Sequence, residues 1–155
     1  MDIAGFLKAR ITEDESLALG AGKESAEWHA TVEETADRDS IYHTVAMSNT
    51  GSDIAEMNSI GDDGMYAAEH TARWDPARVL AECSAKRAII ELHHPFNHHG
   101  EHGDYAFCTA CQWDHGSDEP RTDMGIAEYG HPCQTLRALA TIYADHPGFQ
   151  EAWRA

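Results

Sequence analysis

The sequence predicts a single α+β domain over residues 1–155: an N-terminal helix, a small antiparallel β-sheet, a helical elbow and a C-terminal segment ending in a helix. Three observations lead to this prediction. Helix-spaced apolar residues give way to short runs of β-forming residues in the first part of the chain. A proline at Pro76 separates two helical patterns. A long polar segment, rich in histidine, then leads to the last cysteine.

Residues 1–60 are predicted to form a helix followed by the sheet. Apolar residues at helical spacing between Asp2 and Leu19 indicate a helix that ends at the glycines around residue 21. Three β-rich runs follow, and the links between them are too short for crossover helices, so the strands should pair antiparallel. The residues expected to face inward from the helix are Ile3, Phe6, Leu7 and Leu17, and the strands are expected at 28–35, 41–47 and 53–58.

Residues 61–92 are predicted to form the helical elbow. A short helix over 65–74 meets a longer one that begins at Pro76 and ends near Leu92. Proline is favoured at the first position of a helix, and Asp75 before it is a good N-cap. Cys83 lies within the apolar pattern of the second helix, so we interpret it as a small core residue rather than a metal ligand.

Residues 93–155 offer few apolar side chains until the last helix, expected over 133–144. The stretch 97–130 is dominated by Gly, His, Asp and Glu, and it is predicted to be a loop. A loop of this length is uncommon in a compact domain unless something holds it. After the last helix, Phe149 and Trp153 are expected to pack back onto the core.

A metal ion is the predicted constraint on this segment. Cys108 and Cys111 form a C-x-x-C, and Cys133 stands at the start of a helix, where the helix dipole favours a thiolate. Three thiolates and one imidazole are a common tetrahedral zinc set, and His93 is the favoured fourth ligand. The sequence therefore predicts a zinc-stabilised C-terminal segment. The competing histidines are, in order of preference, His94 and His131, followed by His98, His99, His102 and His115.

The amino-acid composition limits the kinds of molecule that the protein could bind and the compartments in which it could work. The chain carries 27 Asp and Glu against 11 Lys and Arg, a formal net charge of −16, so binding to a nucleic-acid backbone is disfavoured. No apolar run approaches the roughly 20 residues that span a bilayer, and no secretory leader is apparent. The expectation is a cytoplasmic protein whose cysteines bind metal rather than form disulfides. Its partner is expected to be another protein, and no oligomeric state is predicted.

The sequence contains no recognisable enzyme motif. H-E-x-x-H, G-x-S-x-G and the glycine-rich phosphate loops are all missing, and Pro132-Cys133 lacks the second cysteine of the deaminase pattern. No catalytic or cofactor-binding residue is therefore predicted, and a non-enzymatic role is favoured. One alternative is a zinc-dependent hydrolase that uses His70, Glu69 or a spare histidine. Another is an acidic nucleic-acid mimic that acts on a basic host protein.

Several motifs together resemble a family of small proteins of unknown function from actinobacteria and their phages. They are A-E-H, D-P-A-R-V-L, L-H, C-x-x-C and P-C-x-T-L-R, in this order. The resemblance supports His93 as a ligand and implies a phage or actinobacterial origin, without indicating any chemistry. The metal site without catalytic partners and the acidic composition favour an accessory factor that binds another protein. The matching residues here are Glu69, His70, Asp75, Pro76, Arg78, His93, Cys108, Cys111, Cys133, Thr135 and Arg137.

Overall fold

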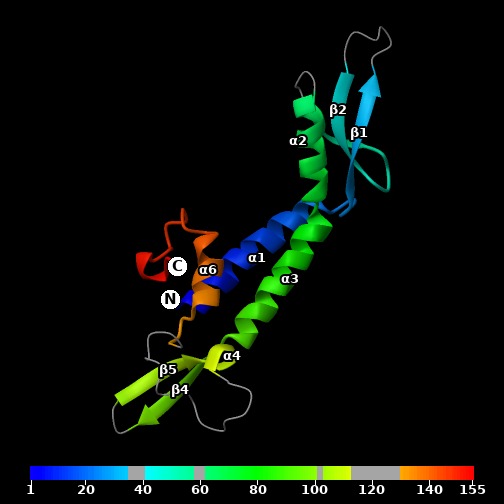
Figure 1. Cartoon of the computed structure of the whole chain (residues 1–155). Helices are drawn as coiled ribbons and strands as arrows, with labels where there is room; N and C mark the ends of the chain where they lie inside the picture. The colour runs from blue at the N-terminus through cyan, green and yellow to red at the C-terminus, as the bar shows by residue number, and fades with distance from the viewer. Residues whose placement is uncertain (35–40, 58–61, 101–102, 113–129) are drawn as a thin grey trace. The chain divides into compact units, whose positions relative to one another are not determined.

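The computed structural model describes residues 1–34, 41–57, 62–100, 103–112 and 130–155 (Figure 1). It confirms the α+β class, with an N-terminal helix, a small antiparallel sheet and further helices. The chain divides into two compact units, which are described separately. Unit 1 consists of residues 1–12 and 84–155, and unit 2 consists of residues 13–83. The expected single domain, with divisions after residues 60 and 92, stays a prediction.

The first helix, α1, spans Ile3–Ala21. Ile3, Leu7, Ile11 and Ala18 are buried along one stripe of it, and Phe6 beside them is fully buried. The prediction that Leu17 faces inward is wrong, because its side chain is 74% exposed. At about 100° per residue, position 17 lies well away from the stripe through positions 11 and 18.

Unit 2 contains the predicted antiparallel sheet, in the order β1-β2-β3. The strands are β1 Trp28–Glu34, β2 Ile41–Met47 and β3 Asp53–Met57. Val45 at the centre of β2 is fully buried, and the pairing of β2 with β3 shifts register directly after it. Gly51, in the turn between these strands, has φ of 67°, a left-handed conformation that glycine adopts without steric strain.

The predicted elbow is present, and the junction of its two helices lies in unit 2. Helix α2 spans Asp62–Arg73 and packs on the sheet, chiefly on β1 and β2, while α3 spans Pro76–Leu92. The Asp75 carboxylate accepts a hydrogen bond from the backbone N–H of Arg78 at 2.8 Å, which confirms it as the N-cap of α3. Cys83 is buried, as expected for a core residue.

The stretch 97–130 is not simply a loop, because regular structure occupies most of 97–112, so this prediction is wrong over nearly the first half of the stretch. β4 (Pro95–Gly100) and β5 (Gly103–Cys108) form an antiparallel hairpin, and the short helix α4 covers Thr109–Gln112. Hydrogen bonds between the two backbones hold the strands together, although the sequence offers no alternation of apolar and polar residues. Residues 113–129 lie outside the described part of the chain.

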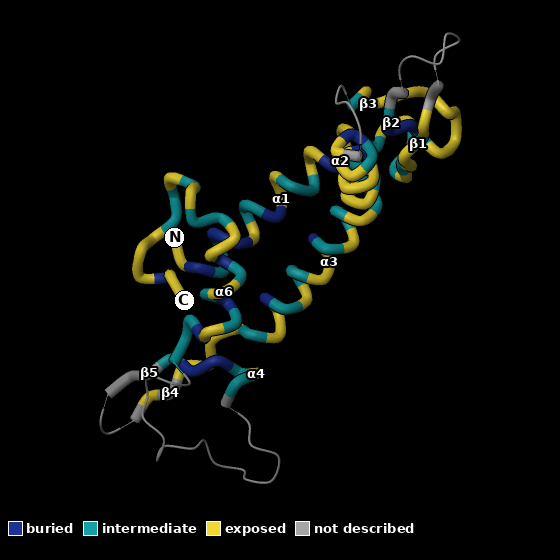
Figure 2. Tube along the Cα trace, turned by 45° about the horizontal axis from the view of Figure 1, so that its top comes forward, coloured by how far each residue is buried: buried dark blue, intermediate teal, exposed yellow. Residues whose placement is uncertain are grey.

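The core of unit 1 is built on the buried ring of Phe6. Helix α6 (Gln134–Thr141) contributes buried Leu136 and Ala140. Figure 2 colours the chain by burial and shows dark blue, buried positions along α6. The 3₁₀ helix η1 (Glu151–Trp153) places Trp153 with its ring centroid 5.1 Å from that of Phe6. Phe149 also contacts Phe6, which confirms the expected packing of the C-terminal residues.

The fold offers no candidate membrane span. Within the described ranges, each helix is too short or too polar to cross a bilayer.

Candidate metal centre

The end of α3 and the start of the C-x-x-C are fastened together by hydrogen bonds. His93 directly follows α3, and its backbone N–H donates to the Ile89 carbonyl at 3.1 Å, so it extends the last helical turn. The Thr109 hydroxyl donates to the Leu92 carbonyl at 2.8 Å, and the Thr109 N–H donates to the His94 carbonyl at 3.0 Å. His93 is thereby held beside the cysteine pair.

The three cysteines come from two chain segments that meet at β5. Cys108 ends β5, and Cys111 follows it three residues later in the short helix α4. Cys133 is the N-cap of α6. The preceding residues lie along β5, because the His131 N–H donates to the Ala106 carbonyl at 2.9 Å. This pairing brings Cys133 to the C-x-x-C.

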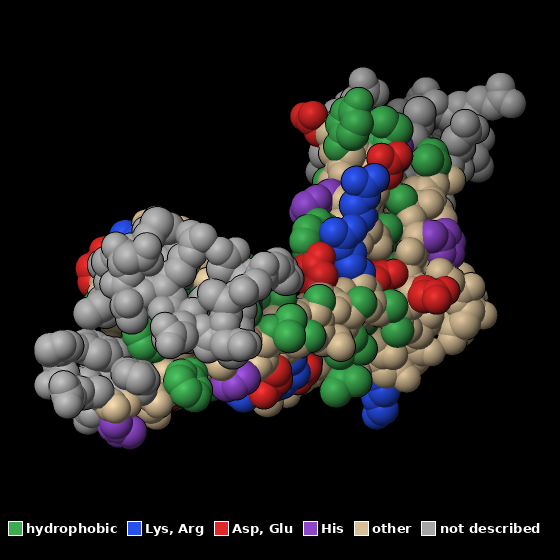
Figure 3. Space-filling view, turned by 60° about the horizontal axis from the view of Figure 1, so that its bottom comes forward, with side chains coloured by type: hydrophobic (Ala, Val, Ile, Leu, Met, Phe, Trp, Pro, Cys, Tyr) green, Lys and Arg blue, Asp and Glu red, His purple; other side chains and the backbone are tan. Residues whose placement is uncertain are grey.

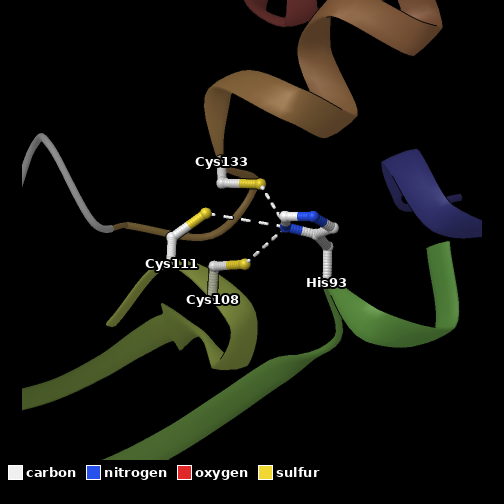
Figure 4. Close-up of side chains that lie close together, drawn as sticks. All are labelled: His93, Cys108, Cys111 and Cys133. Atoms are coloured by element: carbon white, nitrogen blue, oxygen red, sulfur yellow. Dashed lines mark hydrogen bonds between the residues drawn. The ribbon is translucent and has the colours of Figure 1, made fainter. Parts of the chain in front are cut away.

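The four side chains converge on one point (Figure 4). The Nδ1 atom of His93 lies 3.2 Å from the sulfur of Cys108, 3.5 Å from that of Cys111 and 3.4 Å from that of Cys133. All four donor atoms lie within 4.8 Å of one another. One ring nitrogen carries at most one proton, so it cannot donate to three sulfurs at once. The arrangement is better explained as four donor atoms spaced around a common centre.

The spacing fits a tetrahedral ion. Bonds of about 2.3 Å to sulfur and about 2.0 Å to nitrogen place the nitrogen and sulfur ligands of such an ion about 3.5 Å apart. The observed separations of 3.2–3.5 Å agree with that value. Cys108 and Cys133 are buried, and no disulfide joins any of the four cysteines. The cluster can therefore hold a metal ion, as the sequence indicated.

The comparisons with known proteins give a family and no function. A family model of unknown function, DUF6221, matches residues 1–155. The chain belongs to DUF6221. The expected membership of a family of unknown function is confirmed, while its actinobacterial and phage range stays a prediction. No curated protein and no solved structure matches the DUF6221 chain.

Two of the three clustered thiols in the DUF6221 chain resist ionisation when no cation is near. Burial raises the pKa of Cys111 to about 12, and the Cys108 thiol and the charge of Cys133 reinforce the shift. Burial also raises the pKa of Cys108, and this effect outweighs the favourable hydrogen bond with the Cys111 backbone. Three thiolates cannot share so small a space without a compensating positive charge.

Cys133 behaves differently because of its place in the fold. Burial acts to raise its pKa, but the backbone amides of Leu136 and Thr135 in the first turn of α6, and the two neighbouring thiols, lower it overall. The amides at a helix N-terminus carry partial positive charge and stabilise a thiolate. Cys133 is thus the cysteine that most readily supplies the first thiolate to an incoming cation.

The other predicted histidines do not join this group within the described residues. His94 directs Nδ1 to the Glu91 carbonyl at 2.9 Å, and His99 is exposed. His131 is closest in sequence to Cys133, and burial lowers its pKa. Its Nε2 atom is buried without a hydrogen-bond partner in the described chain. The side chain of His98, and His102 and His115, lie outside the described residues.

The remaining residues of the family pattern have structural contacts in the DUF6221 chain. Arg137 donates from Nε to the Pro132 carbonyl at 3.1 Å and so supports the turn that carries Cys133. Glu69 and His70 lie exposed on α2, in unit 2, whereas the cysteines belong to unit 1. Sequence reasoning missed Thr109, the residue that fastens the C-x-x-C to α3, because a threonine between two cysteines gives no signal.

Proposed function

We propose that His93, Cys108, Cys111 and Cys133 bind one Zn²⁺. The observation that carries this proposal is the approach of three sulfurs to within 3.2–3.5 Å of one imidazole nitrogen. Sulfur-rich tetrahedral sets favour zinc over the hard cations magnesium and calcium, which take oxygen ligands. His93 would contribute through Nδ1, and the three cysteines would bind as thiolates.

The zinc is proposed to be structural. A catalytic zinc keeps one coordination position open for water or substrate, whereas four protein donors fill a tetrahedral shell. When bound, the ion would supply two positive charges that offset the thiolates. It would also join the end of α3, the hairpin that ends in Cys108 and the start of α6. Its role would be to hold unit 1 together.

The whole protein is proposed to be a non-enzymatic accessory factor that binds another protein, of the phage or actinobacterial type that the resemblance implies. The closed donor set supports a role without catalysis, and the acidic composition suits a basic partner. Three thiols in one site need a reducing compartment, which supports the cytoplasm as the place of action.

The test of the zinc proposal is the metal content of protein purified under reducing conditions, followed by replacement with Co²⁺. One zinc per chain is expected. The cobalt form should show the intense visible bands of a tetrahedral, thiolate-bound ion. Cys111→Ser and His93→Ala should lose metal or bind it more weakly, whereas Cys83→Ala, which alters the one cysteine outside the cluster, should retain it. Purified wild-type protein that takes up neither ion would refute the proposal.

The same cobalt spectrum separates this proposal from the zinc-dependent hydrolase. A five-coordinate spectrum that changes on adding small anions would reveal an open position and favour the hydrolase. The acidic mimic is tested by competition: a basic partner recovered with the protein should release it when duplex DNA is added.

A further inference from the structure

The outward face of α2 carries a row of ring side chains. Tyr66, His70 and Trp74 follow one another at intervals of four residues, so they lie above one another on one side of the helix. The Trp74 N–H donates to the His70 carbonyl at 3.2 Å, which continues the last helical turn to this residue. Tyr66 is 62% exposed and Trp74 is 42% exposed. These three residues are called the aromatic row.

The aromatic row already binds one cation from its own chain. The guanidinium carbon of Arg78 lies 4.4 Å from the centroid of the Trp74 ring, within the range of a cation–π contact. The His70 ring centroid lies 6.4 Å from that of Trp74. Glu82 accepts a hydrogen bond from Arg78 Nε at 3.0 Å. This surface therefore already holds an arginine side chain between an aromatic ring and a carboxylate.

The charge around the aromatic row selects the class of ligand. Unit 2 contains 16 Asp and Glu against four Lys and Arg. Asp63 and Glu69 are exposed on α2 and form no ion pair with any described residue. Figure 3 shows acidic, basic, histidine and hydrophobic side chains close together on the surface of this unit. A nucleic-acid backbone or a second copy of the chain would be repelled, whereas a basic polypeptide would be attracted.

We propose that the outward face of α2 binds a Lys- and Arg-rich segment of a partner protein. Tyr66 and Trp74 provide ring faces for its cations and for the apolar stems of those side chains, and Asp63 and Glu69 accept its hydrogen bonds. Arg73, exposed on the same helix, and Arg78, which lies over the Trp74 ring, are like charges there and weaken the attraction. The inference rests on the proposed protein-binding function and names the surface and the partner's chemistry.

The test uses the full-length, zinc-loaded chain and three labelled probes: a short peptide of alternating Arg and Gly, the matched Glu and Gly peptide, and oligothymidylate. Fluorescence anisotropy should show binding of the Arg peptide alone, weaker at high salt. Trp74→Ala and Tyr66→Ala should each weaken binding about fivefold, and Trp74→Phe should restore most of it. Arg73→Glu should strengthen binding about threefold. Phe96→Ala, which removes an exposed ring of unit 1, should change nothing.

Three results would overturn the inference. Equal binding of the Arg peptide to wild type and Trp74→Ala would reduce the effect to general attraction by an acidic protein. Binding of oligothymidylate in its place, or of no probe at all, would also contradict the inference. Because the aromatic row contains none of the proposed zinc ligands, metal content is measured on the same samples. If the protein contains zinc but does not bind the peptide, only this inference is contradicted. If it binds the peptide but contains no zinc, only the metal proposal is contradicted.

Discussion

Removing the metal should unfold most of unit 1. The proposed ion closes two loops, one of 15 residues between His93 and Cys108 and one of 22 residues between Cys111 and Cys133. A cross-link that closes a loop of 15 to 22 residues stabilises a protein by about 3 kcal/mol, so the two loops together are worth about 6 kcal/mol. A whole domain of this size is typically stable by about 5–15 kcal/mol.

The predicted loss can be measured as a melting temperature. Unit 1 contains 84 residues, and for a unit of that size each kcal/mol shifts the midpoint by about 4–8 °C. Chelation should therefore lower the melting temperature of this unit by about 25 °C or more. Circular dichroism of samples with and without a zinc chelator, both in reducing buffer, measures the shift. Adding zinc back should restore the original midpoint.

One result of the chelation experiment would contradict this prediction. If the fully chelated protein, with all its thiols reduced, melts within about 2 °C of the zinc-loaded protein, the ion does not hold the segments together. Cys83→Ala serves as the control, because it should keep the same sensitivity to chelator as the wild type.

Three further predictions follow from other parts of the structure. Asp75→Ala removes the cap of α3 and should lower the free energy of unfolding by about 1 kcal/mol in a urea titration. Phe6→Ala empties the centre of the unit 1 core and should lower it by about 3–5 kcal/mol, with loss of the near-ultraviolet dichroism of the surrounding rings. Because the pKa values of Cys108 and Cys111 are raised, the metal-free site holds protons that zinc must displace. Zinc affinity should therefore rise with pH, about 100-fold per unit if two protons are released, as competition with a chelator at two pH values would show.

Short, chemically specific signals in the sequence were the reliable ones. Asp75-Pro76 predicted the start of α3 because a capping carboxylate and a fixed φ act within a few residues. Among many histidines, His93 is the one that the structure brings next to the three cysteines within the described residues, for a similar reason. It stands where an apolar helical pattern ends, and α3 carries it as a rigid element to the cysteines.

The hairpin of β4 and β5 could not be predicted in this way. Phe96 pairs with Phe107 across the strands, but between them stand mainly Gly, His and Asp, which are poor strand formers. The strands are held together by their backbone hydrogen bonds, and Thr109 anchors one end of the hairpin. Neither kind of contact requires a periodic pattern of apolar residues, so neither could be recognised in the sequence. Leu17 failed for a different reason: its apolar character suggested a core position, but at about 100° per residue it lies well away from the buried stripe of α1.

Unit 1 is discontinuous, and this has a consequence for synthesis on the ribosome. Its first 12 residues emerge before unit 2, and its remaining partners begin at residue 84. At about 5–20 residues per second, the chain needs roughly 4–14 s after residue 83 to complete unit 1. For that interval Phe6 has no aromatic neighbours to cover it, although residues 13–83 are already available to fold. The nascent protein should therefore depend on chaperones mainly during translation of its second half.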